Sequence, residues 1–201
     1  MFVSYDGRHW KGHRAGEGTV TTVCVIGLGN VFLGDDGFGP LAIETFRCEY
    51  ECPPGVEVLD LGTPGLDLAP YLYDKELVIV VDAVHSDTAI GTLSIFHEED
   101  FLSHRAKLRI TGHDPGLWDS LAHLRLAGHA PSELIVLGLN PEACEFAEGF
   151  SKTVWSTASR CAAMIARSLC ERGVACVPRL HRAVPNLWWL PLDQSDGHAA
   201  A

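Results

Sequence analysis

The chain has 201 residues and a formal net charge of −11, with 47% hydrophobic and 20% charged residues. This balance fits one globular domain with a sizeable core; no apolar run reaches the about 18 residues of a membrane span, and the negative charge disfavours broad nucleic-acid binding. The N-terminal stretch lacks the apolar core of a signal peptide and the seven cysteines include no CxxC pair, so we expect a cytoplasmic protein with reduced thiols.

Strands alternate with helices over residues 21–176, which we expect to form a single α/β domain. Apolar runs predict strands at about 22–28, 56–61, 77–83, 92–97 and 133–139. Helical spacing predicts helices at about 38–50, 114–126 and 151–172, and a short one that ends near residue 73. The order predicts a three-layer α/β sandwich, a mainly parallel twisted sheet of about five strands with helices on both faces. Residues 1–20 are predicted to form a flexible arm and residues 177–201 an irregular tail.

A glycine-rich turn follows the first predicted strand in the segment VIGLGNVFLGDDGFGP (25–40). Its glycines allow backbone geometries that other residues resist, and the turn delivers Asp35 and Asp36 to the start of a helix. An acidic pair there suits a cation, a proton transfer or a helix N-cap, and it suits a phosphate badly. Phe32 stands where a G-x-G-x-x-G motif needs its third glycine, so a dinucleotide-binding domain is the least favoured alternative.

Two further polar residues are expected at the same edge of the sheet. Asp82 closes the apolar run LVIVVDA (77–83), where a carboxylate is costly to bury unless it is hydrogen-bonded or binds a cation. His113 precedes the predicted helix in TGHDPGLWDSL (111–121). Taken singly, Asp82 is equally well a capping carboxylate, and His113 is more often a surface residue. Together with Asp36 they offer two carboxylates and one imidazole, which suit a borderline divalent ion such as nickel, zinc or iron.

No familiar hydrolase signature is present: the chain has no HExxH, no GxSxG and no P-loop. Cys144, in NPEACEFAEG, has no adjacent base in the sequence, and we interpret it as a structural thiol.

Five motifs occur in order over about residues 22–176: GLGNVFLGDDGFG, LDLGTPGLDL, VVDAV, HDPGLWDSL and LGLNPE. In these motifs the chain resembles the hydrogenase maturation endopeptidases. The resemblance implies an enzyme that removes a short C-terminal extension from the precursor of the nickel–iron hydrogenase large subunit, after nickel has been inserted. The nickel is then supplied by the substrate precursor, and other divalent ions can occupy the site.

The same resemblance implies roles for individual residues. Nickel recognition and catalysis fall on Asp36, Asp82 and His113. Many members have Glu at the first of these positions, so the shorter Asp36 implies a different ligand geometry or precursor fit. Gly62 and Thr63 match a glycine-threonine loop that helps to position the substrate. As a mechanism we hypothesise that the docked nickel polarises the scissile carbonyl or a bound water, with Asp36 or its neighbour Asp35 as general base.

Two alternatives come from other classes of protein. Peptidyl-tRNA hydrolase also opens with a strand and GLGN, although the match stops after this first motif. A non-catalytic maturation chaperone would use the same two carboxylates and histidine to check whether the precursor carries its metal.

Overall fold

A mainly parallel sheet forms the centre of the protein. The computed structural model describes residues 22–99, 109–110, 114–146 and 149–190. The strand order is β3-β1-β4-β7-β5, with β6 paired to β4 off this path. The strands are β1 (Val23–Leu28), β3 (Val56–Gly62), β4 (Leu77–His85), β5 (Leu93–His97), β6 (Arg109–Ile110) and β7 (Leu134–Leu139). Neighbours among β3, β1, β4 and β7 are parallel, and β5 is antiparallel to β7.

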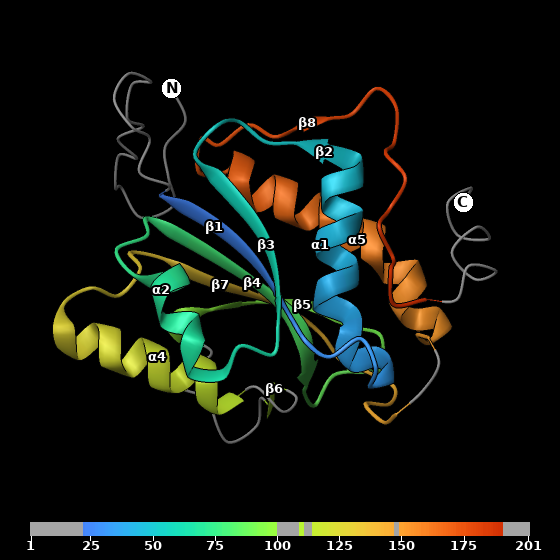
Figure 1. Cartoon of the computed structure of the whole chain (residues 1–201), viewed down its shortest axis with the longest axis horizontal. Coiled ribbons are helices and arrows are strands. Elements are labelled where there is room, and N and C mark those ends of the chain that lie inside the picture. The colour runs from blue at the N-terminus through green and yellow to red at the C-terminus, as the bar shows by residue number, and fades with distance from the viewer. Residues whose placement is uncertain (1–21, 100–108, 111–113, 147–148, 191–201) are drawn as a thin grey trace.

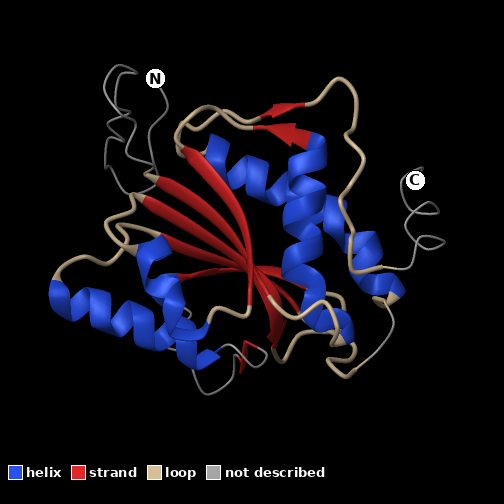
Figure 2. Cartoon of the chain, viewed as in Figure 1, coloured by secondary structure: helices blue, strands red, loops and turns tan. Residues whose placement is uncertain are grey.

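Helices cover both faces of this sheet, so the predicted three-layer sandwich is confirmed (Figures 1 and 2). One face carries α1 (Phe38–Glu49) and α5 (Lys152–Cys170), and the other carries η2 (Gly65–Leu68), α2 (Ala69–Leu72) and α4 (Asp114–Ala127). A separate cluster of buried apolar side chains fills the space under each helical layer. No helix in the described ranges is long and apolar enough to span a membrane.

The sequence of the central strand β4 does not alternate between apolar and polar residues, because both faces of the strand are covered. Its first eight residues are buried, because α1 and α5 cover one face and α2 and α4 cover the other. The predicted end at residue 83 was wrong by two residues: the strand continues because Val84 and His85 pair with β6. Asp82 therefore lies within β4 and not at its end.

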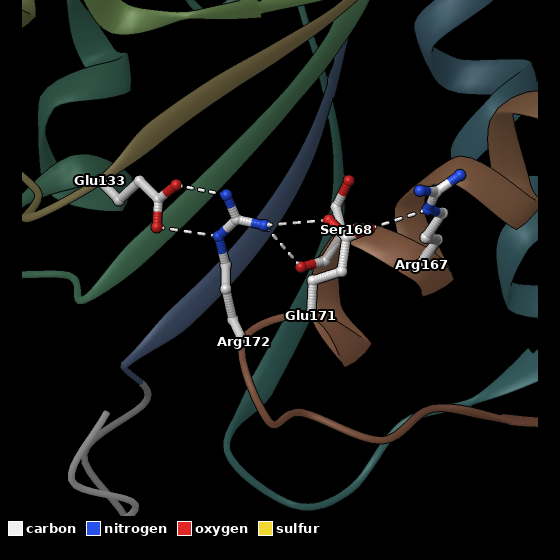
Figure 3. A network of polar contacts seen from close by, with 5 residues as sticks. All are labelled: Glu133, Arg167, Ser168, Glu171 and Arg172. Atoms are coloured by element: carbon white, nitrogen blue, oxygen red, sulfur yellow. Dashed lines mark hydrogen bonds and ion pairs between the residues drawn. The ribbon is translucent and has the colours of Figure 1, made fainter. Parts of the chain in front are cut away.

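Helix α5 begins where the sequence predicts. The Ser151 hydroxyl accepts a hydrogen bond from the Val154 N–H (3.3 Å), as expected of an N-cap. At the other end, Arg172 donates to the Ser168 carbonyl (2.8 Å) and through Nε to Glu133 Oε2 (2.8 Å), while its second guanidinium nitrogen contacts Glu133 Oε1 (Figure 3). Glu133 directly precedes β7, so this ion pair ties the end of α5 to the start of a central strand.

A second, two-stranded sheet was not predicted. β2 (Tyr50–Glu51) follows α1 and pairs antiparallel with β8 (Val177–Pro178). Beyond β8 the chain runs back along α1, where the Ala183 N–H donates to the Cys48 carbonyl (3.2 Å) and Leu187 is 6% exposed. The described part of the predicted tail, residues 177–190, therefore packs against the domain.

Helix α1 approaches the sheet unusually closely at Gly39. A Cβ atom placed there would lie 2.1 Å from the Leu28 carbonyl oxygen and 2.5 Å from the Val81 carbonyl oxygen. The first turn of α1 therefore rests directly on the ends of the β1–β4 pairing, and only glycine permits this contact.

We expect Gly39→Ala to lower the free energy of unfolding by about 1–3 kcal/mol, because the added methyl group overlaps backbone atoms that cannot move independently. Urea denaturation measures this change. The control Arg160→Ala, at an exposed position of α5, is expected to change it by less than about 0.5 kcal/mol. Equal stability of the two variants would contradict the packing described here.

Candidate active site at the strand switch point

The strand order reverses between β1 and β4. From β1 the chain passes through α1 on one face to β3, then returns through η2 and α2 on the other face to β4 (Figure 1). The two strands pair from Val23 opposite Leu77 to Gly27 opposite Val81. In open α/β sheets, ligands bind beyond the carboxyl ends of the strands at such a switch point. Asp35, Asp36 and Asp82 all belong to this region.

Asp36 lies in a tight 3₁₀ turn, η1 (Gly34–Gly37), between β1 and α1. Its side chain is 2% exposed, and Oδ2 accepts a hydrogen bond from the Asn30 N–H (2.9 Å). Gly29 has φ of 134°, and a Cβ atom there would lie 1.8 Å from the Asp36 carbonyl oxygen. Glycine at position 29 is therefore what allows the turn to fold back and bury this carboxylate.

Asp82 lies one residue beyond the last β1–β4 pair, and in β7 it lies opposite Gly138. It is fully buried, and Oδ1 accepts a hydrogen bond from the Ala83 N–H (2.7 Å). Side chains alternate along a strand, so Asp82 shares the face of Val80 and Val84, which belong to the cluster that also contains residues of α2 and α4. A carboxylate in this setting is costly to bury unless hydrogen bonds or a cation offset the cost, so the role of Asp82 stays a prediction.

Asp35 holds the turn against the rest of the site. Its Oδ1 accepts from the Ser151 N–H, and its Oδ2 accepts from the Glu142 N–H and the Ser151 hydroxyl, each at 2.9 Å. Its own N–H donates to the Ala143 carbonyl (3.0 Å). The three donors come from the segment between β7 and α5, so Asp35 fixes η1 to that segment.

The pKa of the Cys144 thiol is influenced by all three carboxylates. Burial raises the pKa of this thiol to about 12, with further contributions from the charges of Asp36, Asp35 and Asp82 in that order. One thiol is thus within electrostatic reach of all three carboxylates. It stays protonated at neutral pH, which agrees with a structural role and not with a nucleophile. The sequence does not predict Cys144 at the site, although the end of the predicted strand at 133–139 indicates that the segment after it reaches the same sheet edge.

The GTPG turn lies beside the glycine-rich turn. The Gly29 N–H donates to the Gly62 carbonyl (2.9 Å), and Gly62 itself has φ of 57°. The Gly62 N–H donates to Asp60 Oδ1 (3.0 Å), so this carboxylate supports the turn. Thr63 is exposed. Gly62 and Thr63 therefore lie next to the turn that carries Asp36, and their role in positioning a substrate stays a prediction.

His113 lies outside the described residues, so its predicted role stays a prediction. Helix α4 begins at the next residue, and a Cβ atom at Gly116 would lie 2.5 Å from the Gly65 carbonyl oxygen. The first turn of α4 thus rests on η2, directly after the GTPG turn. Within the part of the chain that the structure describes, no three His, Cys, Asp or Glu side chains are arranged to hold a metal ion.

The fold and the site define a class of α/β proteins with buried carboxylates at a strand switch point. Comparison with known proteins narrows this class. The model of the hydrogenase maturation protease family matches residues 40–168. The hydrogenase 2 maturation protease of Escherichia coli K12 is 32% identical over 158 residues, which cover 78% of this chain and 96% of that protein.

Two further relatives agree. The hydrogenase expression/formation protein HupM of Azotobacter chroococcum is 31% identical over 163 residues, covering 81% of this chain and 78% of that protein. The solved structure of the hydrogenase maturating endopeptidase HybD from E. coli has a TM-score of 0.73 at 32% identity and covers 78% of this chain and 97% of its own. The chain belongs to the hydrogenase maturation protease family, and the resemblance found in the sequence is confirmed. Membership implies a hydrolase of the endopeptidase type.

We expect Ser151→Ala to lower the free energy of unfolding by about 1–2 kcal/mol, because it removes both the N-cap of α5 and a donor to buried Asp35. Thermal or urea denaturation measures this. The matched control is Ser156→Ala, which changes an exposed hydroxyl of the same helix that bonds only locally, to the Thr153 carbonyl. A larger loss of stability in the control would contradict the assignment of Ser151.

Proposed function

We propose that this protein removes a C-terminal extension from the precursor of a nickel–iron hydrogenase large subunit once the precursor carries nickel. The observation that supports this most strongly is the pair of buried carboxylates, Asp36 and Asp82, at the switch point of a chain that belongs to the hydrogenase maturation protease family. Carboxylates are costly to bury in an apolar domain unless hydrogen bonds or a cation offset the cost, and buried carboxylates in a family of hydrolases are candidates for binding a cation or transferring a proton.

The nickel is part of the substrate in this proposal. Asp36 and Asp82 each offer carboxylate oxygens, and His113 adds an imidazole, a donor set that suits nickel and leaves positions for the precursor's own ligands. Other divalent ions of similar preference can compete for the same donors. Gly62 and Thr63, beside the turn of Asp36, position the precursor chain.

Hydrolysis then needs an electrophile and a base. The nickel bound to the precursor polarises the scissile carbonyl or a water molecule. The general base is Asp36 or its neighbour Asp35, and the three hydrogen bonds that Asp35 accepts fit the role of a supporting residue. Water adds to the carbonyl carbon, the carbon–nitrogen bond breaks, and the proton taken by the base passes to the leaving amine. Because the electrophile arrives with the substrate, the enzyme needs no general protease signature.

Exposed aromatic side chains near this site support a protein substrate. Phe32, in the turn before η1, is 51% exposed and meets Trp188 of the tail edge-on, with ring centroids 6.4 Å apart. Trp188 is 68% exposed, and Phe146, in the segment after Cys144, is 82% exposed. Large exposed aromatic groups near one another are typical of protein contact surfaces.

The cytoplasm is the location we propose for this reaction. All seven cysteines are free thiols, which fits a reducing compartment. The precursor of the hydrogenase large subunit is the proposed partner, and the net charge of −11 offers no support for a nucleic-acid partner.

We expect Asp36→Asn, Asp82→Asn and His113→Ala each to slow precursor cleavage by roughly 100-fold or more, since the first two remove a negative charge that attracts the substrate metal and the third removes an imidazole donor. Cleavage of the nickel-loaded precursor, followed by gel shift or mass spectrometry, measures this. The matched control is Asp74→Asn, an exposed carboxylate that pairs with His129 before the start of β4. Full activity of a folded Asp36→Asn or Asp82→Asn variant would contradict the site.

We also expect the enzyme to cleave nickel-loaded precursor and to leave nickel-free precursor intact, because the metal supplies the electrophile. Both substrates are incubated with the same enzyme preparation, and the released C-terminal peptide is quantified. Equal cleavage of the two would overturn nickel recognition.

The two alternatives predict different outcomes in binding experiments. Tight binding of nickel-loaded precursor without any release of peptide would favour the metal-checking chaperone. Salt-sensitive binding of tRNA would favour the peptidyl-tRNA hydrolase.

A further inference from the structure

Cys52 and Cys176 face each other where β2 meets β8. The paired residues are Tyr50 with Pro178 and Glu51 with Val177, and one further step along this register brings Cys52 opposite Cys176. On the other side of the Tyr50–Pro178 pair, the Arg179 N–H donates a hydrogen bond to the Glu49 carbonyl (2.8 Å).

The hydrogen-bond pattern defines the type of this cysteine pair. Hydrogen-bonded and non-hydrogen-bonded pairs alternate in an antiparallel ladder. Glu49 and Arg179 form a hydrogen-bonded pair, and Pro178 has no N–H to donate, so Tyr50 with Pro178 is a non-hydrogen-bonded pair. Continued one step past the last paired residues, Glu51 and Val177, the register makes Cys52 and Cys176 a pair of the same type. The Cα atoms of such pairs are about 4.5 Å apart, inside the range of about 4.4–6.8 Å that a disulfide requires.

The side chains are in contact as well. The two thiols share a hydrogen bond, which is the largest influence on both: it lowers the pKa of Cys52 and raises the pKa of Cys176. Both residues are only partly buried, so a small oxidant can reach them. Cys52 is therefore the better nucleophile of the pair, and Cys176 is its protonated neighbour.

This pair lies at the far end of α1 from the proposed active site. Helix α1 starts two residues after Asp36 and ends at Glu49, a length of about 18 Å for its 12 residues. The cysteines therefore take no part in the proposed hydrolysis, and the inference about them does not rest on it.

The segment that follows Cys176 connects the two ends of α1. After β8 it runs along the helix, and the Asn186 N–H donates to Glu44 Oε1 (2.6 Å) (Figure 1). It then reaches Trp188, which contacts Phe32 in the turn before Asp35 and Asp36. A covalent bond at Cys176 would thus fasten the start of a segment whose other end lies beside the site.

We propose that Cys52 and Cys176 form a reversible disulfide that fastens the segment 177–190 to α1. With glutathione disulfide as oxidant, the Cys52 thiolate attacks one sulfur, its disulfide bond breaks, and one glutathione leaves as a thiolate that takes up a proton. Cys176 then loses its proton and attacks the Cys52 sulfur of the mixed disulfide, releasing the second glutathione. The two protein thiols are oxidised, and one glutathione disulfide is reduced to two glutathione molecules; excess glutathione reverses both steps.

The test begins with the reduced full-length chain, incubated with glutathione disulfide and then alkylated. We expect the number of free thiols to fall from seven to five, and peptide mass spectrometry to find Cys52 joined to Cys176 with the loss of two hydrogens. Trypsin cleavage after Arg179 and Arg182 is expected to slow and the Tm to rise in the oxidised chain, and added glutathione is expected to reverse both changes.

Cys170→Ser is the matched control, because Cys170 is exposed and also influences Cys176. This variant is expected to oxidise as the native chain does, whereas Cys52→Ser and Cys176→Ser are expected to keep all their remaining thiols. Peptide mass spectrometry of the oxidised native chain identifies the disulfide directly, so the test does not depend on whether each variant folds. A Cys170–Cys176 bond, a lasting mixed disulfide with glutathione or an unchanged count of seven thiols would each overturn the proposal.

Discussion

The close approach of α1 to the ends of β1 and β4 is the constraint on which the rest of the structure depends. At Gly39 no side-chain atom separates the helix from the carbonyl groups of Leu28 and Val81. This contact keeps η1, one turn earlier, directly beyond the sheet and next to Asp82. A side chain at position 39 would lift the helix, and Asp36 would move with it. The contact of α1 with the sheet backbone at Gly39 thus determines where Asp36 lies relative to Asp82.

The adjacent aspartates divide the work at this site. Asp35 accepts three hydrogen bonds from the segment before α5 and so joins β1, β7 and α5 at one point. Asp36 accepts a hydrogen bond from the Asn30 N–H and is the carboxylate proposed to contact the metal. A carboxylate whose oxygens accept several hydrogen bonds is rigid and a poor base. Asp35 can therefore hold the neighbouring Asp36 in place without neutralising the charge of Asp36. The arrangement explains why the two residues occur side by side.

The segment after β8 adds a surface that the matched family region does not include, since the family match covers residues 40–168. It packs Leu187 and Leu190 against the helical layer of α1 and α5 and leaves Trp188 exposed beside Phe32. Its start, at Cys176, is held by the end of α5, where Arg172 binds Glu133 and the Val174 N–H donates to the Leu169 carbonyl. An ion pair, a thiol contact and apolar packing therefore hold the stretch from Arg172 to Leu190 against the domain.

The sequence by itself determined the alternation of strands and helices, the N-cap Ser151 and the family, because local burial and local hydrogen bonds leave periodic and positional traces in it. It also indicated that Asp36 and Asp82 lie at one sheet edge, since parallel strands end together. Only the tertiary structure decided the β2–β8 pair, the extension of β4 by β6 and the packing of residues 177–190. Likewise, Asp35 meets Glu142 and Ser151 across more than 100 residues. Such contacts depend on how distant segments meet in space. The periodicity of side chains along the sequence does not indicate which distant segments will meet.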